Sequence, residues 1–123
     1  ARPLRLAGAS VTLVARRATD GCVEVAKVGA AAVHVDGHAA ELAPHTCHGN
    51  AAELARVRQA GGVVDEHTGR VGSCPADVSR AVGLFAAKRL QPVISSEPET
   101  LVVANAGAAV AVRVAGCGTI TLG

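Results

Sequence analysis

The stretch NAAELARVRQAGG, residues 50–62, predicts the clearest helix of this chain. Asn50 is a good N-cap, and Glu53 stands three residues later, at the spacing of a capping box. Apolar residues recur at helical spacing between these two residues and the end of the stretch. Gly61 stands where a left-handed glycine commonly ends a helix. We therefore expect a helix that packs one side against the rest of the chain.

Two β-hairpins are predicted on the N-terminal side of this helix. ASVTLVARR (9–17) and CVEVAKVG (22–29) are rich in β-branched residues and are joined by a turn that ends in Asp-Gly. In the second of these strands, alternation places Lys27 on the same face as two valines. AAAVHVDGHAAEL (30–42) predicts another hairpin, with a type I′ turn at Asp36-Gly37.

The chain after the first helix predicts one more helix and then further strands. PADVSRAVGLFAAKRL (75–90) has an apolar stripe at helical spacing, although Gly83 interrupts it. Strand-like segments follow, at 93–95, 100–107, 108–116 and 119–122. Strands, then helices, then strands are typical of an α+β fold with antiparallel β-sheet layers and two helices.

Length and composition indicate one domain with a modest core. The chain has 123 residues, which suffices for one domain and not for two ordinary ones. Its apolar residues are mainly Ala, Val and Leu, and Phe85 is the only aromatic residue. Such small side chains bury little area each, so we expect residues 1–123 to be a single partial domain within something larger, with an irregular lead-in at 1–7.

Charge and cysteine usage narrow the functional classes. The net charge is +2, from 12 Lys and Arg against 10 Asp and Glu, and no basic stripe alternates with aromatic residues, so nucleic-acid binding has little support. The four cysteines form no C-x-x-C pair, no signal peptide precedes them, and no apolar run is long enough to cross a membrane. We expect reduced thiols in an intracellular protein, located in the cytoplasm or in an organelle after removal of a targeting peptide.

The segment APHTCHGN (43–50) holds the densest set of metal-binding residue types. His45, Cys47 and His48 lie within four positions. Structural zinc usually takes four ligands as two spaced pairs, and a second pair is missing here unless His38 or Cys74 contributes. We interpret the segment as a polar loop and keep zinc binding as the alternative.

Several motifs, taken in order, resemble the metal-dependent protein phosphatase family, type 2C. GASVTLV (8–14) is similar to the family's G-x-T-A strand, and VAKVGAAAV (25–33) to its V-A-N-V-G-D-S-R-A. ELAPHTCHGNAAELARV (41–57) stands where the family has L-x-x-D-H-K-P followed by E-x-x-R-I. QAGGVV (59–64) is similar to x-A-G-G-x-V.

The resemblance continues through the second half of the chain. GRV (69–71) and VSRAVG (78–83) are similar to R-V-x-G-x-L-A-V-S-R-A-x-G-D, and VISSEPE (93–99) is similar to V-I-A-E-P-E. VRVAGCGTITL (112–122) stands where the family has L-I-L-A-S-D-G-L-W-D. The resemblance implies part of the family's β-sandwich, without its opening D-G-H-G-G strands and without its closing helix.

The resemblance also implies which residues stand at the family's metal-ligand positions. The family's enzymes hold two Mg²⁺ or Mn²⁺ ions with Asp carboxylates, and these metals activate the attacking water. Here Ala30, Leu84 and Cys117 stand at three such positions. Leu and Ala have no ligand atom, and a thiolate prefers softer ions such as zinc. We expect no catalytic residue, no metal and no cofactor, and we interpret Cys117, like Cys22 and Cys74, as a small buried apolar residue.

The residues that match the family's motifs have structural interpretations. Glu53 and Arg56 are expected to pair across one helical turn. Ser79 and Arg80 are expected within the second helix, and Pro98 after a strand. The full set of structural motif residues is Gly29, Glu53, Arg56, Gly61, Gly62, Ser79, Arg80, Gly83 and Pro98.

These observations predict a catalytically inactive type 2C phosphatase-like domain, a pseudophosphatase, with a structural or protein-binding role in a larger assembly. We expect a protein partner, or the remainder of a larger chain, to cover an exposed sheet, without contact to membrane. Two alternatives stay open. One is a portion of an active Mg²⁺- or Mn²⁺-dependent protein Ser/Thr phosphatase, and the other is a small zinc- or RNA-binding module.

Overall fold

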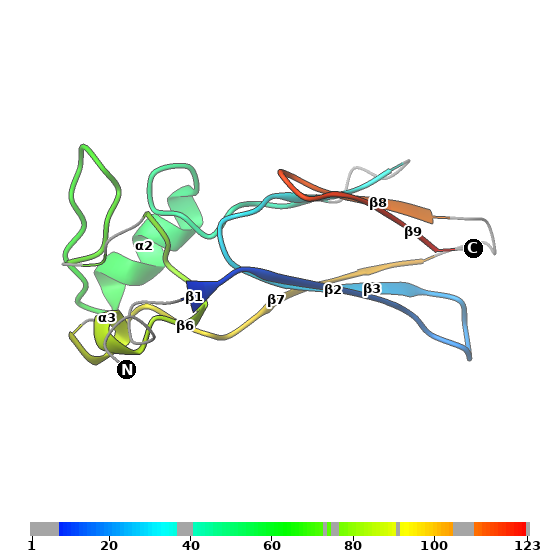
Figure 1. Cartoon of the computed structure of the whole chain (residues 1–123), viewed down its shortest axis with the longest axis horizontal. Coiled ribbons are helices and arrows are strands. Elements are labelled where there is room, and N and C mark those ends of the chain that lie inside the picture. Colours follow the sequence, from blue (N-terminus) through cyan, green and yellow to red (C-terminus); the bar gives the residue numbers. More distant parts are fainter. Residues whose placement is uncertain are drawn as a thin grey trace.

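A computed structural model describes residues 8–36, 41–72, 74, 77–90, 92–104 and 110–122 of the chain. Within these residues the strands form antiparallel sheets, and two helices lie at one end of the molecule (Figure 1). The same view shows the longer strands running away from the helical end. The expected α+β fold with antiparallel layers and two helices is confirmed.

The first sheet has three strands in the order β2-β3-β7. These strands are β2 (Val11–Arg16), β3 (Val23–Val28) and β7 (Glu99–Val103). β2 and β3 pair in an antiparallel register, which confirms the first predicted hairpin. Side chains alternate across the sheet, so the even-numbered residues of β2 face inward and the odd-numbered ones face solvent.

The second sheet has four strands in the order β5-β4-β8-β9. They are β4 (Val33–Val35), β5 (Glu41–Leu42), β8 (Val110–Val114) and β9 (Gly118–Leu122). β4 and β5 pair in an antiparallel register, as the second predicted hairpin requires. The residue after Asp36 in the predicted turn lies outside the described residues.

Valines from both sheets form the main hydrophobic core. The cluster comprises Val23, Val25, Val33, Val35, Leu42, Val103, Val110, Val112 and Val114. Val14 of β2 and Leu122 of β9 pack against it from the two strands that lie at the ends of their sheets. Lys27 is buried on the same face of β3 as Val23 and Val25, as the alternation predicts.

The helix predicted over 50–62 is present as α2 (Ala51–Gln59). Asn50 is the N-cap, and its side-chain Oδ1 accepts a hydrogen bond from the backbone N of Glu53 at 3.3 Å. Gly61 has φ +90°, the left-handed conformation expected after a helix end. Neither helix of the described part of the chain is long and apolar enough to cross a membrane.

The prediction of a second helix over 75–90 is wrong for most of its length. Only α3 (Phe85–Leu90) is helical, because Gly83 and Leu84 take positive φ values of 85° and 53° that a right-handed helix does not allow. Val82–Gly83 forms β6, which pairs with β1 (Gly8–Ala9). Ser79 and Arg80 are therefore not helical, and Arg80 forms a parallel bridge with Ser95.

A second hydrophobic cluster occupies the helical end of the molecule. It comprises Cys47, Val57, Val71, Cys74, Val78, Ala81, Leu84, Ala87 and Ile94. Phe85, the aromatic residue of the segment predicted as the second helix, is 68 % exposed and lies outside this cluster. The described residues thus form two cores, one between the large sheets and one beneath the helices.

Two smaller predictions for the segment before β7 also need correction. The strand expected over 93–95 is reduced to the single bridge at Ser95, and Pro98 precedes β7 instead of following a strand. The lead-in at 1–7, His38, and residues 105–109 of the expected strand-like segments lie outside the described residues.

Candidate functional site

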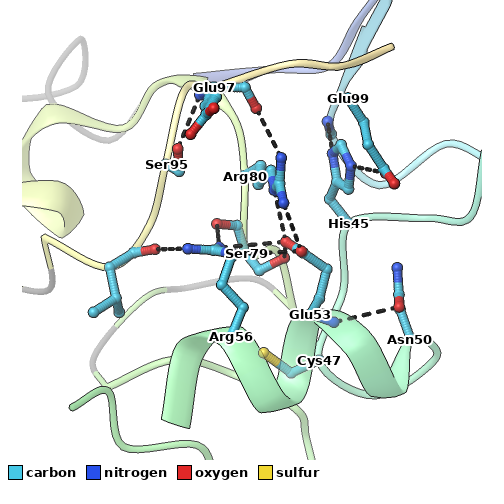
Figure 2. A network of polar contacts seen from close by, with 12 residues as sticks. His45, Cys47, Asn50, Glu53, Arg56, Ser79, Arg80, Ser95, Glu97 and Glu99 are labelled. Carbon is cyan, nitrogen blue, oxygen red and sulfur yellow. Dashed lines mark hydrogen bonds and ion pairs between the residues drawn. The ribbon is translucent and has the colours of Figure 1, made fainter. Parts of the chain in front are cut away.

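A buried carboxylate in the first turn of α2 organises the polar contacts of the helical end. Glu53 is only 4 % exposed. Arg80 donates two hydrogen bonds to it, from Nε to Oε1 and from Nη2 to Oε2, both at 2.9 Å (Figure 2). The hydroxyl of Ser79 donates to Oε1 at 2.7 Å. A parallel pair of charge-assisted bonds is the strongest geometry for an Arg–carboxylate contact.

Arg56 supplies the other contacts to this carboxylate. It lies one turn after Glu53 on α2 and donates to both carboxylate oxygens at 3.3 Å, which confirms the expected pairing across one turn. Its guanidinium also donates at 3.0 Å to the backbone carbonyls of Val93 and Ser79. Arg80 reaches the carbonyl of Glu97 at 3.2 Å. Both guanidinium groups are thus committed to contacts that join α2 to two loops.

The charge state of Glu53 follows from these contacts. Burial raises the pKa of its carboxyl group, but hydrogen bonds from Arg80, Ser79 and Arg56 outweigh burial and lower this pKa to about 2. The same contact raises the pKa of Arg80 above its ordinary value. Glu53 is therefore ionised at physiological pH, as are its two arginine partners. The cluster holds structural elements together and offers no group that could act as a general acid or base.

His45 joins the large sheets to this helical end. It is completely buried, its Nδ1 accepts a hydrogen bond from the backbone N of Gly29 at 3.0 Å, and its Nε2 lies 2.7 Å from Glu99 Oε1. Because Nδ1 is an acceptor, the proton of the neutral ring resides on Nε2 and is donated to Glu99. The backbone of His45 also bonds to Gly29 and Ser79.

Lys27 lies beside His45, with its ammonium group on backbone carbonyls. Its Nζ donates to the carbonyl of Gly29 at 3.0 Å and to that of Ala43. Burial lowers the pKa of Lys27 to about 8, although Glu99 and Glu53 oppose this shift. Alternation predicts the inward direction of Lys27, but nothing in the sequence pairs His45 with Glu99, which starts a strand 54 residues later.

The APHTCHGN segment is a loop, as expected from the sequence, but two of its three candidate metal ligands are buried. His45 and Cys47 are buried, whereas His48 is exposed. Both ring nitrogens of His45 have hydrogen-bond partners, and the backbone N of Cys47 donates to Asp77 Oδ1 at 3.1 Å. In the described ranges, no group of three or more His, Cys, Asp or Glu residues could hold a metal ion. The three zinc candidates are thus not brought together as a ligand set.

The structure describes the surroundings of each of the three residues that the resemblance assigns to metal-ligand positions, Ala30, Leu84 and Cys117. Leu84 packs against Gly8, and the hydroxyl of Ser10, two residues on, accepts a hydrogen bond from the backbone N of Ala30. Cys117 lies at the β8–β9 turn, next to Ala115, whose backbone N bonds to Ala32. The side chains at these three positions are thus an isobutyl, a methyl and a thiol group.

These residues do not fit a site for Mg²⁺ or Mn²⁺. Such ions require several oxygen ligands, and neither Leu84 nor Ala30 has an oxygen in its side chain. Cys117 lines a shallow depression of about 690 Å³, in which Glu41 is the only carboxylate among the described residues. Cys117 is exposed, so its interpretation as a buried apolar residue is wrong; Cys74 is buried, and Cys22 is half-buried.

Leu84 has an unusual backbone conformation for its type. It is the only non-glycine residue with positive φ in the described part of the chain, and its side chain is buried. The left-handed region costs an ordinary residue roughly 1–2 kcal/mol, whereas Asp and Asn tolerate it better because of their local hydrogen bonds. The backbone at this position therefore suits an Asp better than the Leu that occupies it.

Two large antiparallel sheets and a helical end built around the buried Glu53 carboxylate form an α+β domain. Over residues 7–111 the sequence matches the family described as protein phosphatase 2C. The chain belongs to the protein phosphatase 2C family.

A solved structure supports this fold. A sex-determining protein of C. elegans is 24 % identical to this chain, with a TM-score of 0.64. The similarity covers 85 % of this chain and 26 % of that one, so the chain spans about a quarter of that protein's length. No curated protein matches the chain.

Proposed function

We propose that the chain is a catalytically inactive phosphatase 2C-like domain with a structural or protein-binding role. The observation that carries the proposal is the set of side chains at the family's ligand positions, Ala30, Leu84 and Cys117. None of them offers an oxygen ligand to a hard dication. Without two such ions, no water is activated for attack on phosphorus.

The polar contacts of the helical end support the same proposal. Arg56 and Arg80 are the two guanidinium groups of that end that lie deepest, and both already donate to Glu53 and to backbone carbonyls. Moving either one toward a phosphate would remove one of the two guanidinium groups that compensate the buried Glu53 carboxylate. The cluster stabilises the scaffold and is not a phosphate-binding site.

An exposed apolar surface supports the protein-binding part of the proposal. The outer face, meaning the solvent side of the β2-β3-β7 sheet, carries Val11, Leu13 and Val102 at 46 %, 65 % and 52 % exposure. A group of exposed apolar residues on a sheet commonly marks a site of association. A protein partner, or the remainder of a longer chain, covers this face. The free thiols of all four cysteines support an intracellular location.

The proposal is tested by titrating the chain with Mn²⁺ in a calorimeter and by measuring phosphate release from a phosphopeptide with Mn²⁺ present. An active member of the family serves as the positive control. We expect neither stoichiometric binding nor turnover. The Cys117→Ser variant is the matched control, because it removes the thiol and with it any weak metal binding by that residue. Stoichiometric Mn²⁺ binding that persists in this variant, together with turnover, would show that other carboxylates serve as ligands and that the domain is an active phosphatase.

A further inference from the structure

The side of β2 that faces away from β3, called here the β2 edge, is open. In the three-stranded sheet the strand order is β2-β3-β7, so among the described residues no strand pairs with the β2 edge. β2 reads VTLVAR, with its single charge at the last position. Proteins usually protect such an edge with Lys, Pro or a bulge, and β2 has none of these within its six residues.

The hydrogen-bonding phase of β2 shows which of its backbone groups point outward. The backbone N of Arg17 donates to the carbonyl of Cys22 at 2.8 Å, so this pair is a hydrogen-bonded one. Such pairs recur at every second residue of an antiparallel ladder, so the odd-numbered residues of β2 bond to β3. The N–H and C=O groups of Thr12 and Val14 therefore point away from β3, toward solvent.

The sequence of β2 is complementary to itself across a two-fold axis at Leu13. In this register, Thr12 of one copy bonds to Val14 of the other, and the reverse pair forms as well. Leu13 then lies opposite Leu13 of the second copy on the outer face, and Val11 lies opposite Ala15. The charged residue Arg16 lies opposite Ser10, so no like charges face each other.

In the part of the chain that the structure describes, β9 also has an unpaired edge, on the same side of the molecule as β2. β9 ends the four-stranded sheet, and Nη2 of Arg16 in β2 reaches the carbonyl of Leu122 in β9 at 3.4 Å. The two-fold axis at Leu13 is perpendicular to the sheet. The same rotation that pairs the two β2 edges therefore also brings the β9 edges of the two copies to face each other. A six-residue edge is about 20 Å long and buries too little area for a stable dimer by itself, so both edges are needed.

We propose that the protein bound at the β2 edge is a second copy of this chain, in an antiparallel β2–β2 pairing centred on Leu13. This inference rests on the proposed protein-binding role and names the partner in it. The pairing continues each sheet across the axis and buries Leu13, the most exposed apolar residue of the outer face. Because the axis closes the pair, the assembly stops at two copies.

Sedimentation velocity on the 123-residue chain, from about 1 to about 200 µM, tests the proposal by mass action. We expect a monomer–dimer equilibrium with a Kd on the order of 10 µM, as befits a small interface. Leu13→Lys places two ammonium groups opposite each other and should weaken the dimer at least about tenfold. Leu90→Lys is the matched control, because Leu90 is 67 % exposed against 65 % for Leu13 and lies on α3; it should leave the Kd unchanged.

Thr12→Pro provides an independent test of the backbone pairing. The backbone N–H of Thr12 points away from β3. Proline at this position therefore removes no hydrogen bond within the monomer's sheet, but it removes one of the hydrogen bonds between the two copies. Circular dichroism checks that each variant is folded. A wild type that stays monomeric, an assembly that grows beyond two copies, or folded Leu13→Lys and Thr12→Pro variants with unchanged Kd would each overturn the proposal.

The phosphatase assay on the same samples separates this inference from the proposed function. Dimerisation without turnover supports both proposals. Turnover from a dimer would overturn the inactive-domain proposal and leave the edge pairing intact. An inactive monomer would overturn the edge pairing alone.

Discussion

Arg80 holds the buried carboxylate of Glu53 through two parallel hydrogen bonds of 2.9 Å, across 27 residues of sequence. The two residues come from α2 and from the irregular segment before β6, so their contact fixes the helix against that segment. Arg56 adds a second guanidinium to the same carboxylate. The helical end therefore depends on one negative charge shared by two positive ones.

Replacing this charge should strongly destabilise the fold. Glu53→Gln keeps the shape of the side chain but leaves two guanidinium groups without a counter-charge, and we expect a loss of about 3–5 kcal/mol in the free energy of unfolding. Urea denaturation measures this loss. Glu66→Gln is the matched control, because Glu66 is exposed, and it should change stability by less than about 0.5 kcal/mol. A loss below about 1 kcal/mol for Glu53→Gln would mean that the buried pair contributes little.

Acid should remove the same contribution in the wild type. The pKa of Glu53 is lowered from 4.5 to about 2 in the fold, so the stabilisation is complete above pH 4.5 and is lost as the pH falls toward 2. A shift of this size corresponds to about 3 kcal/mol. Unfolding by urea at a series of pH values, for the wild type and Glu53→Gln, isolates this part of the pH dependence. If both proteins lost stability in parallel below pH 4.5, other carboxylates would account for acid unfolding.

His45 gives a separate pH dependence near neutrality. Burial lowers the pKa of its ring below the ordinary 6.5, and the hydrogen bond to Glu99 opposes this only in part. As the pH falls through 6.5, the unfolded chain binds a proton that the folded chain does not, so stability decreases. The nearby charges are those of Lys27, Glu53, Glu99 and Arg80.

The His45→Asn variant tests this dependence. Its Oδ1 can accept the hydrogen bond from Gly29 that Nδ1 accepts in the wild type, and it does not titrate. We expect the wild type to lose stability between pH 7 and 5, and the variant to show a flatter profile over that range. His67→Asn is the control, because His67 is exposed in a turn. A profile flattened equally by both substitutions would exclude His45 as the responsible group.

The sequence predicts the elements whose local signals agree with their packing. The hairpin over 9–29 has both alternation and an Asp-Gly turn, and α2 has both a cap and a glycine stop, so each is confirmed. The helix over 75–90 has only a periodic stripe, which does not report the left-handed backbone at Leu84. Tertiary contacts decide that segment, because Arg80 extends toward Glu53 and Ser95.

The polar site shows a similar division. The Glu53–Arg56 pair is predictable because its spacing is helical. The contacts of Arg80 with Glu53 and of His45 with Glu99 span 27 and 54 residues, and no local pattern encodes them. The burial of His45 is likewise not encoded locally, because its ring accepts a hydrogen bond from the backbone N of Gly29, 16 residues earlier.

Leu84 and Gly8 should be energetically coupled. A Cβ atom added at Gly8 would lie 2.5 Å from Cγ of Leu84, and its closest contacts are all with that side chain. Gly8→Ala should therefore destabilise the fold by about 1–3 kcal/mol, and Leu84→Ala by about 2–5 kcal/mol through its cavity. In the double variant the clash is absent, so its loss of stability should be smaller than the sum of the two single losses by about 0.5–3 kcal/mol.

Urea denaturation of the two single variants and the double variant measures this coupling. Gly49→Ala is the matched control, because the only close contact at that position is the Thr46 hydroxyl at 3.3 Å. It should show no coupling with Leu84→Ala. Strictly additive losses for Gly8→Ala and Leu84→Ala would show that the two residues do not contact each other in solution.

The four cysteines should differ in reactivity according to their burial. Cys117 is exposed at the β8–β9 turn, whereas Cys47 and Cys74 are buried, and burial raises the pKa of the Cys47 thiol. Because the thiolate is the reactive form, iodoacetamide should modify Cys117 about a hundredfold faster than either buried residue. Peptide mass spectrometry over a time course measures each rate. In Cys117→Ser the fast modification should disappear, and in urea all remaining thiols should react alike. Rapid modification of Cys47 in the folded chain would mean that the segment between β5 and α2 opens readily, and that His45 does not hold it closed.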